Sequence, residues 1–224
     1  MLGRLERPLR TIGPMEHDGE SESSFGSLSV AEFLGAVASK TPAPGGGAVA
    51  SMTGALASAL GQMVVAYSVG KKSLAEYEPR LRGAILRLER ARALLLGLAD
   101  EDAEAYNLVN TLQKLPEDDE RRKATLDDAL HASVQVPLAT MAACVDLLRL
   151  FLELAPITNK HLRSDLGISA VLADAAARAS RWNVVVNAAQ LSREQDRLHT
   201  SRQLNAMLHD SAALVRQVEQ ACEV

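Results

Sequence analysis

One acidic side chain stands where helical spacing predicts an inward-facing residue. In the segment LADEDAEAYNLV, Asp102 continues an apolar row that includes Leu95, Leu98, Tyr106 and Val109. The three other acidic residues of the segment fall on other faces, where charged side chains are usually solvated. An inward carboxylate has to be paired, protonated or directed into a pocket, because an isolated buried charge is costly. Asp102 is therefore a candidate acid/base catalyst or counter-ion, and the alternative is a structural Asp held by hydrogen bonds.

A proline and glycine segment, TPAPGGGAVA at residues 41–50, precedes a long run of small apolar residues. A helix that starts here leaves its first backbone N–H groups unpaired and carries partial positive charge. Glycines let a ligand approach those N–H groups closely, so Pro44, Gly45, Gly46 and Gly47 form a candidate anion-binding site. No Gly-Lys-Ser/Thr follows and no strand is predicted to precede the segment, so it is neither a P-loop nor a dinucleotide-binding turn. Glycines needed only for helix packing are the alternative.

Two pairs of polar residues stand at predicted helix ends. Lys71 and Lys72 close the helix that follows the glycines. They could clamp a carboxylate-bearing ligand, and their ordinary role is to complement the helix dipole. Ser164 and Asp165 stand where another helix is expected to begin, so they are candidate substrate-binding residues whose ordinary role is capping.

Asn183 and Asn187 lie four residues apart on one face of an apolar helix, so two side-chain amides share surroundings in which both need partners. They could bind a polar heterocycle or tie helices together, and Asn187 is taken as a candidate substrate-binding residue. The five histidines have no metal-ligand spacing, and no Ser-His-Asp or Cys-His grouping can be argued. The sequence therefore predicts neither a metal nor a bound cofactor.

Helical periodicity determines where all of these residues lie. Apolar side chains recur at spacings of three, four and seven, and aromatics make up only 3% of the chain, a composition typical of closely packed helices. We predict an all-α, up-and-down bundle of five to six helices. Their expected ranges are 29–39, 48–70, 77–114, 118–154, 164–191 and 201–222. Ser29 and Glu32 are predicted to form a capping box at the start of the first helix. Pro137 is expected to kink the fourth helix.

The helices are expected to form one domain. Residues 1–27 mix arginines with Pro, Gly, Ser and Glu without an apolar period, which predicts a disordered leader. Residues 28–224 are predicted to be a single helical domain. The second, third and fifth helices carry more apolar surface than one bundle of this size hides, which predicts a homodimer.

The composition argues against several classes of protein. A formal net charge of −4 is unlike that of a general nucleic-acid binder. No apolar run approaches the roughly 20 residues that span a bilayer, and no secretory signal is apparent at the N-terminus. Cys144 and Cys222 fall within apolar helical patterns and are predicted to be reduced core residues. We expect a cytoplasmic protein without nucleic-acid or membrane partners.

Several segments together resemble the cyclodeaminase/cyclohydrolase family, which includes the formiminotetrahydrofolate cyclodeaminase domain and bacterial methenyltetrahydrofolate cyclohydrolases. In chain order these segments are FLGAVASKTPAPGGGAVASMTGALASALGQMV, VGKK, DEDAEAYNLV, KLP, QVPL, SDLGISA and NVVVNAAQL. The resemblance covers residues 29–191 and implies an all-helical, dimeric protein that binds a folate one-carbon derivative. The chain departs from the family pattern at Ala48, where a serine is usual, and at Ser73 and Leu74, where an aromatic is usual.

The resemblance also implies a reaction, the hydrolysis of 5,10-methenyltetrahydrofolate to 10-formyltetrahydrofolate. Asp102 would be the acid/base catalyst, and Lys72 would be a second catalytic residue that helps to orient substrate or water. The glycine-segment amides, with Lys71 or Lys72, would bind the anionic parts of the folate. Ser164, Asp165 and Asn187 would orient substrate or water. The alternatives are a cyclodeaminase that releases ammonia from a formimino group, a non-catalytic folate-binding protein, and a helical interaction protein. A chain of 224 residues has no room for a formiminotransferase domain, which favours the hydrolase.

Overall fold

A computed structural model describes residues 24–223, and every regular element in this range is a helix. The α-helices are α1 (Val30–Val37), α2 (Gly46–Ala66), α3 (Glu78–Gln113), α4 (Glu120–Leu154), α5 (Arg163–Ala188) and α6 (Glu194–Cys222). Short 3-10 helices in the same range are η1 (Phe25–Ser27), η2 (Lys72–Tyr77), η3 (Ala155–Ile157) and η4 (Lys160–Leu162). Most of the predicted leader lies outside the described residues, and η1 shows that regular structure begins before the boundary expected at residue 28.

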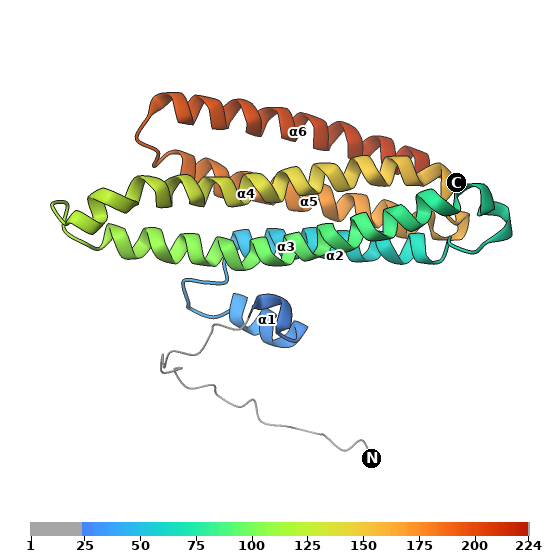
Figure 1. Cartoon of the computed structure of the whole chain (residues 1–224), viewed down its shortest axis with the longest axis horizontal. Helices are drawn as coiled ribbons and strands as arrows, with labels where there is room; N and C mark the ends of the chain where they lie inside the picture. The colour runs from blue at the N-terminus through green and yellow to red at the C-terminus, as the bar shows by residue number, and fades with distance from the viewer. Residues whose placement is uncertain (1–23, 224) are drawn as a thin grey trace, which may run out of the picture.

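Helices α2, α3, α4 and α5 form an antiparallel bundle in which each helix packs against the next and α5 closes the ring against α2 (Figure 1). Helix α6 lies along α4 and α5 on one side of this bundle. Helix α1 sits beside the bundle and is connected to α2 by the proline and glycine segment (Figure 1). The predicted all-α class and up-and-down order are confirmed for the described part of the chain.

Small residues on α2 allow its neighbours to approach closely. An added Cβ at Gly54 would lie 2.9 Å from the Cys144 sulfur of α4, and one at Gly61 would overlap the ring of Phe151. Ser58 is fully buried, and its hydroxyl donates a 2.6 Å hydrogen bond to a carbonyl oxygen of α3. Because a packed interior tolerates little movement, these contacts hold α2 in one position within the bundle.

Local signals explain several helix ends. The Ser29 hydroxyl accepts a hydrogen bond from the Glu32 N–H, and the Ser29 N–H donates to the Glu32 carboxylate, so the predicted capping box is confirmed. Helix α2 ends at Ala66, earlier than expected, and a turn follows to Gly70, whose φ of 77° lies in the left-handed region that favours glycine. Helix α6 begins at Glu194 rather than near residue 201, with acidic side chains in its first turn that suit the helix dipole.

The prediction that Ser164 or Asp165 caps α5 is wrong. The chain turns helically earlier, at η4, where the Asn159 side chain accepts a 3.3 Å hydrogen bond from the His161 N–H. Helix α5 continues directly from η4 with Leu162 as its N-cap and without a side-chain capping bond. Ser164 and Asp165 therefore lie inside the first turn of α5 and not at its N-cap position.

Helix α2 and the two cysteines are apolar parts of the sequence that the bundle buries. Contrary to expectation, α2 is long and apolar enough, by length and composition alone, to cross a membrane. More than half of it is buried between other helices, as in the core helix of a bundle. Cys144 and Cys222 are free and buried, as predicted, and burial raises the pKa of the Cys144 thiol to about 12.

Candidate active site

The side chain of Asp102 on α3 lies against the first turn of α2. An added Cβ at Gly47 would overlap the Asp102 carboxylate, so this close approach requires glycine. Burial, which removes hydration, raises the pKa of Asp102, and the Ala48 backbone N–H, which faces the carboxylate, lowers it by a smaller amount. A carboxylate with a raised pKa accepts a proton more readily than an exposed Asp, which suits acid/base chemistry.

The N-cap residue of α2 has no side chain with which to cap the helix. Its N-cap is Gly45, which is followed by the exposed Gly46 and the buried Gly47, while Pro44 is buried after a cis peptide bond. The Ala48 N–H of this first turn faces the Asp102 carboxylate. The N–H groups of Gly46 and Gly47 are therefore the ones available to an outside acceptor, and the helix dipole adds partial positive charge. Backbone donors and the Asp102 carboxylate therefore meet within one helical turn.

The two asparagines of α5 have different surroundings. The Asn187 side-chain N–H donates a 2.7 Å hydrogen bond to the Ser133 carbonyl of α4. That carbonyl lies four residues before Pro137, which has no N–H to donate to it. Asn187 thus pairs the acceptor that the proline leaves free and ties α5 to α4. Asn183, one turn earlier, lies beside α2, and an added Cβ at Gly46 would be 3.8 Å from its Oδ1.

The remaining predicted site residues lie at the other end of the bundle. Lys71 and Lys72 follow the C-terminus of α2, and Ser164 and Asp165 lie in the first turn of α5. The loop before α5 is hydrogen-bonded to the turn that ends α2, so both pairs lie at this end (Figure 1). Helix α2 has 21 residues and a length of about 30 Å at a rise of about 1.5 Å per residue. One chain therefore does not bring these four residues to the carboxylate.

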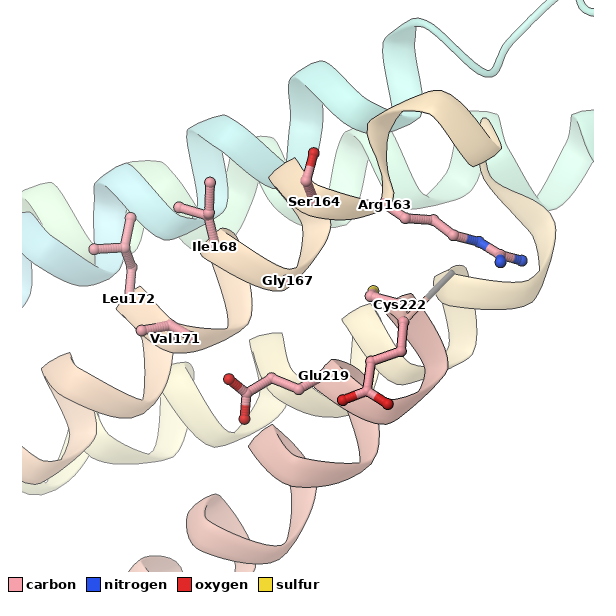
Figure 2. A pocket seen from close by; sticks show the side chains of 9 residues that line it. Arg163, Ser164, Gly167, Ile168, Val171, Leu172, Glu219 and Cys222 are labelled. Carbon is pink, nitrogen blue, oxygen red and sulfur yellow. The ribbon is translucent and has the colours of Figure 1, made fainter.

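A groove of about 410 Å³ opens at this second end, between the start of α5 and the end of α6 (Figure 2). Ser164, Ile168 and Val171 contribute from α5, and Glu219 and Cys222 contribute from α6. The groove is therefore a mixed polar and apolar surface, and it lies at the end of the bundle away from the glycine segment.

Two neighbours of Asp102 differ from the sequence prediction. Tyr106, four residues after Asp102, is 49% exposed. The apolar members of the row, Leu95, Leu98 and Val109, are buried as expected. Asp100 is not simply solvated, since it accepts hydrogen bonds of 2.6 Å from the Ser24 hydroxyl and 2.8 Å from the Phe25 N–H. Asp100 therefore holds η1 against α3.

The sequence matches a known family from just before α1 into α6. The matching residues are 29–206, and the family is described as Formiminotransferase-cyclodeaminase. The chain belongs to this family. The resemblance carried by the glycine, lysine and Asp102 segments is thereby confirmed, and the formiminotransferase-cyclodeaminase match covers both ends of the bundle described above.

The chain is similar both to a protein named as a cyclohydrolase and to proteins named as cyclodeaminases. The chain is 32% identical over 193 residues to the methenyltetrahydrofolate cyclohydrolase of Methylorubrum extorquens, covering 84% of this chain and 93% of that protein. It is 30% identical over 207 residues to the formimidoyltransferase-cyclodeaminase of Gallus gallus, covering 90% of this chain and 38% of that protein. The crystal structure of formiminotetrahydrofolate cyclodeaminase from Thermotoga maritima is similar with a TM-score of 0.81 and 32% identity, covering 88% of this chain and 96% of that chain.

Proposed function

We propose that this family member is a folate one-carbon enzyme that hydrolyses 5,10-methenyltetrahydrofolate to 10-formyltetrahydrofolate. The observation that carries the proposal is the Asp102 carboxylate, recessed against the glycine-rich N-terminus of α2. The substrate combines a cationic amidinium bridge with anionic carboxylates, and this turn offers both a negative side chain and free backbone donors. The match to 93% of the Methylorubrum extorquens cyclohydrolase supports the same reaction.

The reaction makes and breaks bonds at one carbon and moves protons from the attacking oxygen and to the departing nitrogen, so a single carboxylate can serve both steps. A water oxygen bonds to the bridge carbon while Asp102 accepts one water proton, which neutralises the amidinium. The bond from that carbon to one ring nitrogen then breaks, and the nitrogen takes the proton that Asp102 returns. The remaining hydroxyl proton goes to solvent as the formyl C=O forms. A positioned carboxylate contributes on the order of 100-fold to 10,000-fold to such a reaction.

The departures from the family pattern leave these groups in place. Ala48 contributes its backbone N–H to the surroundings of Asp102, and that N–H is present whatever the side chain is. Leu74 packs against the core of the bundle near the lysines instead of presenting an aromatic ring. The proposed proton transfers therefore do not depend on the serine or the aromatic residue that is usual at these positions.

A second copy of the chain completes the proposed site. Two neighbouring helices carry exposed apolar side chains at helical spacing, which form a face on each. These side chains are Val49 and Leu56 on α2, Tyr67 at its C-cap, and Ile168, Val171, Trp182 and Val186 on α5. Apolar faces of this kind on a bundle are typical of interfaces, so we expect the two copies to meet through α2 and α5.

A two-fold dimer through these faces explains why the predicted site residues are divided between the ends of α2. Two copies of α2 that pack antiparallel place the N-terminus of one near the C-terminus of the other. The Asp102 of one copy would then meet Lys71, Lys72, Ser164 and Asp165 of the second copy. Each dimer would contain two identical sites, in which Lys72 assists the carboxylate and the other three residues orient substrate.

The cyclodeaminase reaction is the second candidate, favoured by the similarity to the Thermotoga maritima cyclodeaminase structure at a TM-score of 0.81. In that reaction ammonia leaves the formimino group as the bridge closes, and the same carboxylate would pass a proton to the leaving nitrogen. A non-catalytic folate-binding protein and a helical interaction protein are the further alternatives.

Turnover of both substrates by the purified full chain separates these functions. We expect the near-ultraviolet absorbance of methenyltetrahydrofolate to decay faster with the protein than in buffer, and little ammonia to be released from formiminotetrahydrofolate. Faster ammonia release than hydrolysis would select the cyclodeaminase, and saturable binding without turnover would select the non-catalytic protein. A chain that binds neither substrate would overturn the folate function. We also expect the enzyme to need neither a metal nor a cofactor and to be located in the cytoplasm.

A further inference from the structure

Asn183 and Asp102 face consecutive residues of one helical turn. Asn183 comes from α5, and its Oδ1 and Nδ2 lie 3.8 Å and 3.9 Å from an added Cβ at Gly46. Asp102 comes from α3 and lies against Gly47. The first turn of α2 therefore has a carboxamide from one neighbouring helix and a carboxylate from another.

The Asn183 carboxamide is free to bind a ligand. Within residues 24–223 it has no hydrogen-bond partner, whereas the amide of Asn187 is committed to the Ser133 carbonyl. Asn183 is partly buried, and an amide in such a position takes its hydrogen bonds from water or from a bound molecule. Of the two asparagines on this face of α5, Asn183 is thus the one available at the start of α2.

A carboxamide presents an N–H donor and a C=O acceptor side by side. This donor and acceptor can pair with the C=O and N–H of a cyclic amide. The pyrimidinone edge of a pterin ring is such a cyclic amide. The one-carbon bridge of a folate is attached to that ring, so a substrate with its bridge carbon at Asp102 has the ring over the same turn of α2.

We propose that Asn183 is a specificity-determining residue that pairs with the N–H and C=O of the pterin edge, an inference that rests on the proposed folate function. This contact is the same in the bound substrate and in the transition state, because the reacting carbon is elsewhere in the molecule. Asn183→Ala should therefore raise KM about 10-fold and leave kcat within a factor of two or so, whereas loss of Asp102 lowers kcat. Asn183→Ala should also leave the Tm unchanged, in contrast to Asn187→Ala.

An acidic replacement tests the pairing pattern itself. Asn183→Asp has acceptors only, so it should weaken binding of tetrahydrofolate, which lacks the bridge and is not turned over. A 2,4-diamino analogue of tetrahydrofolate has an amino donor in place of the ring C=O. When this analogue is protonated at N1, its N1–H and 2-amino groups form two charge-assisted hydrogen bonds to a carboxylate in a turned-over orientation of the ring. The Kd values of tetrahydrofolate and of the diamino analogue can be measured by isothermal titration calorimetry. In Asn183→Asp the Kd of tetrahydrofolate, divided by that of the analogue, should be about 10-fold or more higher than in the wild type.

Three outcomes would overturn the assignment. An unchanged KM in Asn183→Ala, with normal wild-type turnover, would remove Asn183 from the site and leave the proposed function standing. An equal loss of affinity for both ligands in Asn183→Asp would exclude the pterin edge as its partner. A wild-type protein that neither binds tetrahydrofolate nor turns over either substrate would overturn the proposed function and this inference with it.

Discussion

The Asn187 side-chain amide donates a 2.7 Å hydrogen bond to the Ser133 carbonyl, the acceptor that Pro137 leaves without its helical donor. Asn187→Ala should lower the free energy of unfolding by about 1–3 kcal/mol, because it leaves a buried carbonyl without a partner. Urea unfolding measures this loss.

A double-mutant cycle isolates the role of the proline. Pro137→Ala restores an N–H that can donate to Ser133, so Asn187→Ala should cost less free energy of unfolding in that background than in the wild type. Equal costs in the two backgrounds would show that Asn187 does not compensate for Pro137.

Gly47→Ala should be destabilising, because the added methyl group overlaps the Asp102 carboxylate. We expect a loss of about 1–3 kcal/mol in the free energy of unfolding, together with a fall in kcat as the carboxylate is displaced. Gly97→Ala on α3 is the matched control, since an added Cβ there meets no atom within 4 Å. That change should raise stability by up to about 1 kcal/mol, and a similar loss in both variants would contradict the close contact.

Asp102→Asn should lower kcat for methenyltetrahydrofolate hydrolysis by about 100-fold or more, because the amide cannot accept the water proton. The decay of near-ultraviolet absorbance measures the rate. Unchanged turnover in the folded variant would eliminate Asp102 as the base.

Asp102→Asn should raise the stability of the fold at neutral pH, although it lowers kcat. Burial raises the pKa of Asp102 above its ordinary value of 3.8, so the stabilising contribution is complete below that pH and is lost as the pH rises through the folded-state pKa. Asp102→Asn stays neutral at every pH. Its Tm should therefore exceed that of the wild type at pH 7, and the difference should shrink as the pH falls towards 3.8. A lower Tm than the wild type at pH 7 would contradict the burial of a charged group.

Leu56→Asp should convert the proposed dimer to a monomer, because it puts a charge in the apolar face of α2. Leu56 is 62% exposed in one chain, and Leu198 on α6 is 50% exposed, so Leu198→Asp is a control of similar exposure outside that face. Light scattering should give half the wild-type mass for Leu56→Asp only. A wild-type protein that already has the mass of one chain would remove the dimer.

Mixing two inactive variants tests whether the site is shared between copies. In a dimer with shared sites, Asp102→Asn and Lys72→Ala chains combine so that one of the two sites in each mixed dimer has neither substitution. Random exchange of chains should restore about a quarter of the wild-type activity. Mixtures that stay inactive after exchange would place both residues in one chain's site.

The helix order and the inward position of Asp102 could be predicted because apolar period and capping are local properties of the sequence. The start of α5 could not, because the η4 turn begins the helical path before Ser164 and replaces it as the capping position. The different environments of Asn183 and Asn187 depend on the register of α4 against α5, which no local pattern sets. The separation of Lys72 from the glycine segment could have been foreseen, since the length of the intervening helix was readable in the sequence.

The number of residues in α2 determines how far apart the two halves of the proposed site lie. An insertion of one residue within this helix would rotate everything after it by about 100° and lengthen it by about 1.5 Å, although no ligand-facing side chain would change. We therefore expect a shared site of this kind to tolerate no gain or loss of residues within α2, in addition to requiring small residues where its neighbours pack closely.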